Sequence, residues 1–177
     1  MADGQARAIR PEELLHQANR LGGRDGTERL PIDLRRAVSS AYYALFHSIA
    51  LGTAHQLLPD GAPEEAHSLA RMVPHGGIKF VCSHITNDNT GPAYTNIIFE
   101  RVKANIDLRQ AADAFETLYV QRHKADYDHL EPFTRAGVLS LVDLATKAVD
   151  DLALMRGTTD LQRFHALIAL QAKQPNR

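Results

Sequence analysis

The sequence has one cysteine, Cys82, among 177 residues, and this scarcity removes two classes of site. A lone thiol cannot form an intrachain disulfide, and it cannot supply a thiolate zinc centre within one chain. The same usage suits a reducing cytosol, so we expect a cytoplasmic protein. The fold must then rest on its hydrophobic core, which can be substantial in a chain of this length.

Long apolar runs are also missing. Stretches such as residues 136–142 are far shorter than the ~20 residues that a helix needs to span a bilayer. The first residues, Met-Ala-Asp-Gly-Gln-Ala-Arg, contain no apolar core, so no signal peptide is expected. We therefore expect no membrane partner.

Neither sign of charge predominates. The 20 Lys and Arg residues against 21 Asp and Glu residues give a net charge of -1 with histidine neutral. This balance excludes a polycation, although it leaves room for a local basic patch. Internal repeats and low-complexity tracts are absent as well, so the length predicts a single domain.

The apolar periodicity predicts an all-α fold, because no segment shows convincing strand alternation. Asp33 and Thr134 are expected to cap two of the long helices. The third long helix begins at residue 96 or, if the turn cluster at 87–92 forms a longer loop, at residue 107. We expect an antiparallel bundle of four main helices with additional short ones. The predicted helical segments are 11–21, 33 to about 52, 63–72, 78–82, 96 or 107 to about 122, 134–152 and 161–168.

One apolar stripe turns into a row of ionisable groups. Its apolar members recur at spacings of three and four residues, which places them on one helix face: Leu108, Ala111, Phe115, Leu118 and Tyr119. The same period continues to Arg122, Asp126 and His129. Charged side chains are seldom fully buried unless they are paired. The row therefore indicates a wet cleft, an interface or a polar network.

These residue types suit phosphodiester chemistry. Arg122 has a planar fork that matches phosphate oxygens, and His129 can act as acid or base near neutral pH. Asp126 could orient a histidine or hold Arg122, while His123 and Lys124 lie beside the row. In RNA the ribose 2′-hydroxyl can serve as the nucleophile, so no metal is required.

A structural interpretation of the same residues stays open. Arg122 and Asp126 have the spacing of an ordinary intrahelical ion pair, and His129 could simply cap a helix end. Asp128 adds a carboxylate next to them, but no HExxH motif or glycine-rich phosphate loop occurs. We therefore expect no metal site and no cofactor.

The second long helix carries His47 between apolar residues. Such a histidine is more often a core or interface residue than a ligand. If the two long helices pair, however, Tyr43 and His47 would share a groove with Arg122 and Asp126. Near the start of the same helix, Arg35 and Arg36 are expected to be exposed and solvated.

Two segments of the chain resemble the HEPN family. Residues 33–47, Asp-Leu-Arg-Arg-Ala-Val-Ser-Ser-Ala-Tyr-Tyr-Ala-Leu-Phe-His, are similar to its first long helix, where an Ala-Tyr-Tyr-Ala-x-Phe-His pattern is common. Residues 122–128, Arg-His-Lys-Ala-Asp-Tyr-Asp, resemble the Arg-x-x-Ala-Asp-Tyr pattern that ends a later helix. Between them, His75-Gly-x-x-Lys79 is similar to a segment of bacterial members. The resemblance covers about residues 31–155.

This resemblance implies a compact helical bundle, often a homodimer with a cleft at the interface. Many members are metal-independent ribonucleases with an Arg and a His separated by four to six residues, and six separate Arg122 from His129. A polar residue directly after the Arg is common, and His123 fits. Some members are toxins paired with a nucleotidyltransferase antitoxin that can modify a nearby tyrosine, for which Tyr127 is the candidate.

We therefore expect residues 1–177 to form one HEPN-like domain that binds RNA or a nucleotide as a homodimer. Its activity is expected to be metal-independent endoribonuclease of toxin or phage-defence type, with Arg122, Asp126 and His129 as catalytic residues. The residues expected to contact the substrate are His47, His123, Lys124 and Tyr127. The alternative is a non-catalytic nucleotide-binding or scaffold module that partners another protein, such as a nucleotidyltransferase.

Overall fold

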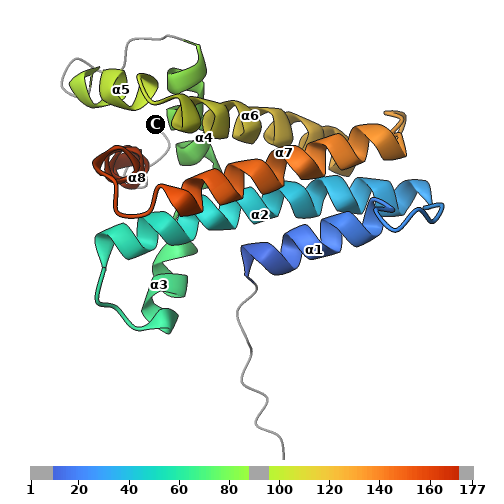
Figure 1. The fold of residues 1–177 in the computed structure, drawn as a ribbon, viewed down its shortest axis with the longest axis horizontal. Helices are drawn as coiled ribbons and strands as arrows, with labels where there is room; N and C mark the ends of the chain where they lie inside the picture. The colour runs from blue at the N-terminus through green and yellow to red at the C-terminus, as the bar shows by residue number, and fades with distance from the viewer. Residues whose placement is uncertain (1–9, 88–95, 172–177) are drawn as a thin grey trace, which may run out of the picture.

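The computed structural model describes residues 10–87 and 96–171, and within these ranges all regular secondary structure is helical (Figure 1). This confirms the predicted all-α class. No helix of the described ranges is long and apolar enough to cross a membrane. The described helices are α1 Pro11–Leu21, α2 Pro31–Leu57, α3 Pro63–Ala70, α4 His75–Thr86, α5 Asn96–Lys103, α6 Ile106–Tyr127, α7 Arg135–Leu154 and α8 Thr159–Gln171.

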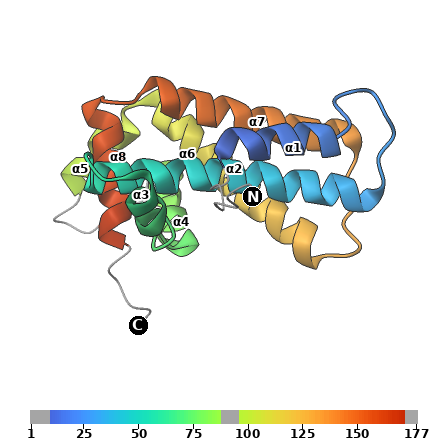
Figure 2. The ribbon, with the colours of Figure 1, turned by 90° about the horizontal axis from the view of Figure 1, so that it is seen from below.

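Four helices, α1, α2, α6 and α7, lie side by side and alternate in direction along the chain (Figures 1 and 2). The longest, α2, contacts the other three. The shorter helices α3, α4, α5 and α8 gather around one end of this bundle. The predicted bundle of four main helices with short additions is therefore the observed architecture.

Local signals set several helix ends. Thr134 caps α7 as predicted, because its hydroxyl oxygen accepts the backbone N–H of Gly137 at 3.2 Å. The prediction that Asp33 is the N-cap of α2 was wrong, because the N-cap is Leu30. The helix α2 begins earlier, at Pro31, and Asp33 lies in its first turn, where the carboxylate accepts the N–H of Leu30 at 3.3 Å.

The third long helical segment is divided into α5 and α6. Asn105 makes the division, since its side-chain oxygen accepts the N–H groups of Asp107 and Leu108 and caps α6. The apolar segment predicted at 78–82 belongs to the longer helix α4, which begins directly after Pro74. Of the turn cluster at 87–92, residues 88–92 lie outside the described residues.

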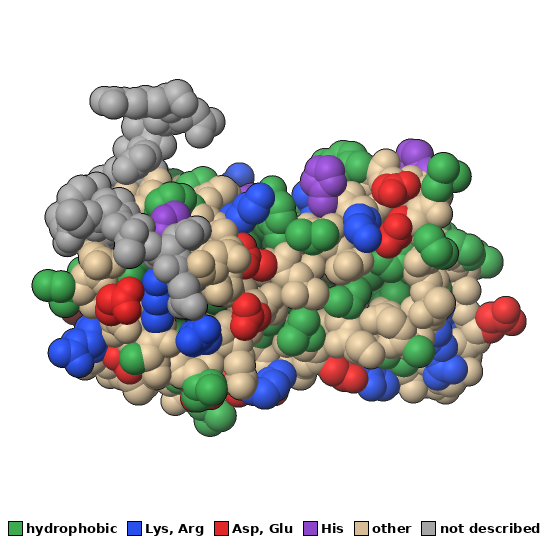
Figure 3. Space-filling view, turned by 90° about the horizontal axis from the view of Figure 1, so that it is seen from above, with side chains coloured by type: hydrophobic (Ala, Val, Ile, Leu, Met, Phe, Trp, Pro, Cys, Tyr) green, Lys and Arg blue, Asp and Glu red, His purple; other side chains and the backbone are tan. Residues whose placement is uncertain are grey.

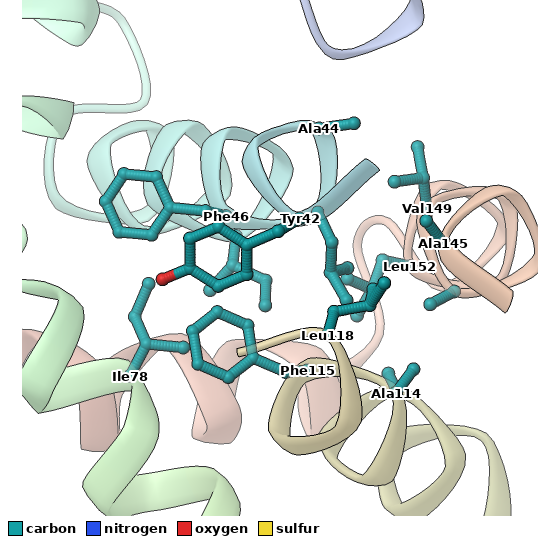
Figure 4. Close-up of a cluster of buried hydrophobic side chains, with 14 of the residues drawn as sticks. Tyr42, Ala44, Phe46, Ile78, Ala114, Phe115, Leu118, Ala145, Val149 and Leu152 are labelled. Atoms are coloured by element: carbon teal, nitrogen blue, oxygen red, sulfur yellow. The ribbon is translucent and has the colours of Figure 1, made fainter. Parts of the chain in front are cut away.

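One aromatic residue is central to the core. The ring of Tyr42 lies between Phe46 and Phe115, beside Ile78 of α4 (Figure 4). Tyr42 is fully buried, and so are Phe115 and Leu118 on the apolar stripe of α6. The predicted inward faces of α2 and α6 therefore meet each other. This contact brings the C-terminal half of α6 against α2 and fixes where its polar residues lie.

The last helix, α8, docks on α2 at Gly52. A Cβ atom built on Gly52 would lie 2.6 Å from the ring of His165, so only a glycine allows this approach. His165 is buried, and its Nδ1 lies 3.0 Å from the Thr53 hydroxyl. That hydroxyl donates to the carbonyl of Ile49 at 2.9 Å, so its oxygen accepts the Nδ1–H of a neutral His165.

Candidate functional site

The ion pair of Arg122 and Asp126 lies at the contact between α2 and α6. Arg122 Nε is 2.6 Å from Asp126 Oδ2, and the two side chains are 21% and 28% exposed. The N–H is not aimed at the oxygen, since within the described residues this buried Nε has no hydrogen-bond partner. From α2, the Ser39 hydroxyl donates to Asp126 Oδ1 at 2.7 Å. The carboxylate therefore bridges the two helices.

Aromatic rings surround the Arg122 guanidinium. Its Nη2 donates to the Tyr43 hydroxyl at 3.1 Å. Its Cζ lies 5.6 Å from the ring centroid of Tyr43, 5.7 Å from that of Tyr127 and 5.9 Å from that of Tyr42. These are cation–π distances. Burial acts to lower the pKa of Arg122, but Tyr43 and Asp126 outweigh it and raise that pKa, so the group stays cationic.

A second imidazole, which the sequence pattern does not predict as a site residue, contacts the same tyrosines. His75 opens α4, and its Nδ1 is 2.6 Å from the hydroxyl of Tyr42. Its ring is stacked on Phe46 with centroids 3.8 Å apart and planes 3° from parallel. Burial and then the charge of Arg122 lower the pKa of His75, so the imidazole is neutral at pH 7.

His47 belongs to the same group through Tyr43. The two rings are stacked with centroids 6.1 Å apart, and the His47 side chain is half-buried. Burial and then the nearby His67 lower the pKa of His47. The pairing of α2 with α6 thus gathers Tyr43, His47, Arg122 and Asp126 on one region of the surface, which is the arrangement expected if the long helices paired.

The row of ionisable groups does not extend to His129. The helix α6 ends at Tyr127, and His129 is exposed in the turn that follows. Among the described residues it makes no hydrogen bond, ion pair or ring contact, so the structure does not bring it to Arg122. The helical period that was carried forward to His129 is wrong, because two residues after the helix end the period no longer applies. Asp128 is also exposed there, as the C-cap of α6.

The other predicted contact residues lie on the outer side of α6. Tyr127 is 63% exposed, and the exposed His123 ring is 4.8 Å from it. Lys124 points to the turn, where its Nζ is 2.9 Å from the Glu131 carboxylate. Figure 3 shows histidine side chains close to basic and acidic ones on a raised part of this surface. Arg122 is therefore close in the chain to an exposed aromatic ring, Tyr127, and an exposed imidazole, His123.

Comparison of the chain with protein-family models, curated proteins and solved structures finds no match. The HEPN resemblance stays a prediction that rests on the motifs of α2 and α6. Any function must be argued from the chemistry of the site.

Arg35 is not the solvated arginine that the sequence suggested. Its guanidinium reaches across from α2 and closes the C-terminal end of α6. Its Nη1 donates to three backbone carbonyls and its Nη2 to a fourth, and its Cζ lies 5.3 Å from the Phe133 ring. Arg36, by contrast, is exposed as expected. The carbonyl acceptors, with their distances, are Lys124 at 3.3 Å, Ala125 at 3.0 Å, Asp128 at 2.8 Å and Glu131 at 2.7 Å.

Metal binding gains no support from the described part of the chain, where no group of three or more His, Cys, Asp or Glu could hold an ion. Cys82 is fully buried, and burial raises the pKa of its thiol well above the usual range. A buried thiol of this kind is a poor nucleophile. The groups that can act on a ligand are therefore the cation, the imidazoles and the phenols around Arg122.

Proposed function

We propose that the protein is an HEPN-like RNA-binding protein in which Arg122 binds a backbone phosphate. The observation that supports this proposal is the set of partners of the Arg122 guanidinium nitrogens. Tyr43 and Asp126 hold two of its nitrogens, whereas within the described residues Nη1 makes no hydrogen bond and is not among the buried unpartnered atoms. A fixed cation that keeps one side open is preorganised for a phosphate oxygen.

The surroundings favour RNA over a simple anion. Single-stranded RNA is bound through its phosphates and through unpaired bases that stack on aromatic side chains. Tyr127 offers an exposed ring within cation–π distance of Arg122, and the exposed His123 ring lies 4.8 Å from it. A base could stack there while its phosphate contacts the guanidinium.

In this proposal the RNA strand is cleaved at the phosphate that Arg122 binds. The ribose 2′-hydroxyl would attack phosphorus as the bond to the 5′-oxygen breaks, and Arg122, oriented by Asp126, would stabilise the negative charge on the phosphoryl oxygens. His123 or His129 would take the proton of the 2′-hydroxyl or give one to the leaving 5′-oxygen. A homodimer with two such sites, and a nucleotidyltransferase antitoxin as a partner, belong to the proposal as consequences of the family resemblance.

The test compares wild-type protein with Arg122→Ala, His123→Ala and His129→Ala for binding and cleavage of a single-stranded RNA in EDTA. We expect Arg122→Ala to weaken binding at least tenfold. Cleavage should be lost in either His123→Ala or His129→Ala, whichever histidine transfers the proton, and should persist in the other. Arg109→Ala is the matched control, because Arg109 is an exposed arginine of α6. Wild-type affinity in a folded Arg122→Ala protein would refute the proposal.

A second candidate is a non-catalytic scaffold module, and one observation favours it. Asp126 has both oxygens engaged, by Ser39 of α2 and by Arg122, as expected of a residue that fixes helix register. In this case RNA affinity would be the same in wild type and Arg122→Ala, and only stability would change.

A further inference from the structure

The helix α4 borders the Arg122 site on a side that the proposed function leaves unused. It packs against α6, and its first residue, His75, contacts the same two tyrosines as Arg122. The His75 ring centroid lies 5.9 Å from that of Tyr42 and 6.1 Å from that of Tyr43. Arg122 Cζ lies 5.9 Å and 5.6 Å from the same centroids. The imidazole and the guanidinium are therefore neighbours across two shared rings.

The contact with Tyr42 fixes which nitrogen of His75 carries the proton. Tyr42 is fully buried, burial raises the pKa of its phenol, and within the described residues the hydroxyl has His75 Nδ1 as its one hydrogen-bond partner. A protonated phenol with no other acceptor donates to Nδ1. The neutral ring must then carry its hydrogen on Nε2. That nitrogen is not among the buried unpartnered atoms of the described residues, so its N–H is open to a ligand.

A second cation lies along the same contact between α4 and α6. Lys79 is one turn after His75, and its exposed Nζ lies 4.7 Å above the ring of Tyr119. Tyr119 is one turn before Arg122 on α6, and its ring is 6.1 Å from that of Tyr42. Lys79 thus extends the cationic side of the site by about one helical turn.

We propose that α4 supplies the second half of the phosphate site, with His75 donating its Nε2–H to the phosphate bound by Arg122 and Lys79 contacting a neighbouring phosphate of a single-stranded RNA. This inference rests on the proposed function and assigns it a substrate path along the contact of α4 and α6. Tyr42 is then a positioning residue, because it acts on the ligand only through the tautomer of His75.

The two α4 residues differ in charge, and this makes their roles separable. Each cation that contacts single-stranded nucleic acid contributes about 0.7 to the slope of log K against log salt. Replacing Lys79 should lower that slope, whereas replacing the neutral His75 should weaken binding and leave the slope unchanged. A residue with a merely structural role would not lower the slope, and the Nε2 resonance of a merely structural His75 would not shift when RNA binds.

The experiment measures the affinity of the full chain for a single-stranded RNA oligonucleotide over a series of salt concentrations. Lys79→Gln is expected to lower the slope by about 0.7, and His75→Asn to weaken binding about three- to tenfold at constant slope. The controls are Arg109→Gln, an exposed cation of α6, and His55→Asn, an exposed histidine of α2. Both controls should match the wild type.

Nuclear magnetic resonance keeps the test valid if a variant is unstable. In wild type the His75 ring should show the Nε2–H tautomer, Tyr42→Phe should lose that preference, and RNA should shift the Nε2 resonance. Inorganic phosphate and a mononucleotide serve as competing probes. RNA should bind more tightly than either, and equal affinity would overturn the assignment to an RNA strand.

The outcomes separate the two proposals. If Arg122→Gln binds RNA like the wild type, the proposed function fails. If Arg122→Gln weakens binding while His75→Asn and Lys79→Gln behave like their controls, the proposed function stands and the role of α4 is refuted. An Nδ1–H tautomer of His75 in the wild-type protein would also refute it.

Discussion

The Asp126 carboxylate contacts residues of two helices. One oxygen accepts the hydroxyl of Ser39 on α2, and the other lies against Arg122 on its own helix. Removing a charged partner from a fully buried pair costs about 3–5 kcal/mol, but this pair keeps 21% and 28% of its side-chain surface in water. Solvent screening therefore reduces the cost of breaking it.

We predict that Asp126→Asn lowers the free energy of unfolding by about 1–2 kcal/mol, because an amide keeps the shape and loses the charge. Urea denaturation monitored by helical circular dichroism measures this change. Asp113→Asn, at an exposed position of α6, should change stability by less than about 0.5 kcal/mol. Equal stability of Asp126→Asn and wild type would show that the bridge contributes nothing.

For single residues, the sequence predicted those contacts whose two partners are close along the chain. The spacing of Arg122 and Asp126 gives their ion pair directly. It could not give the partners of Arg35 or His75, because these lie 33 or more residues away and depend on how the helices dock. Long-range contacts of this kind carry no periodic signal.

Among the elements, α6 has an unusual C-terminal end. Helices commonly end on a glycine that satisfies the last carbonyls, but α6 ends at Tyr127 and Asp128 follows in an extended conformation. The guanidinium of Arg35 supplies donors to four carbonyls in this region instead. A side chain of α2 thereby caps the C-terminal end of α6.

We predict that Arg35→Met destabilises the protein by about 2–3 kcal/mol, since the freed carbonyls lose charge-assisted hydrogen bonds. Arg36→Met is a matched control, because Arg36 is the exposed neighbour in the same turn of α2. It should change the free energy of unfolding by less than about 0.5 kcal/mol. Thermal or urea unfolding of the two variants makes the comparison, and equal midpoints would contradict the capping role.

Helix existence followed from local chemistry, whereas helix boundaries did so only in part. Pro11 begins α1 and Thr134 caps α7, both as the sequence predicts. The apolar pattern continues on both sides of Asn105 and by itself favours one unbroken helix, whereas the structure has two, α5 and α6. The Asn105 side chain accepts two backbone N–H groups and so begins a new helix at this point.

For the whole molecule, the docking of α8 on α2 links stability to pH. Burial lowers the pKa of His165 to about 4, below its ordinary value of 6.5. The unfolded chain therefore binds a proton between these values that the folded protein excludes. The contribution of His165 to the free energy of unfolding is therefore fully present above pH 6.5, and it is lost as the pH falls toward 4.

We predict a loss of about 3 kcal/mol from His165 over this window. The midpoint of urea unfolding, measured from pH 7 to pH 4, should fall more steeply in wild type than in His165→Asn. His55→Asn, at an exposed position of α2, should retain the wild-type steepness. A parallel decline in wild type and His165→Asn would show that His165 is not the group that titrates.

The cap that Arg35 places on α6 also has a consequence for the order of folding. Donors to the carbonyls of Lys124 and Ala125 come from Arg35 of another helix, so the last turn of α6 is fully stabilised only after α2 has docked alongside it. The turn that carries Arg122 and Asp126 is then among the slower parts of the bundle to acquire protection from amide exchange. A nascent or partly unfolded chain would expose these residues without the geometry that lets them act together.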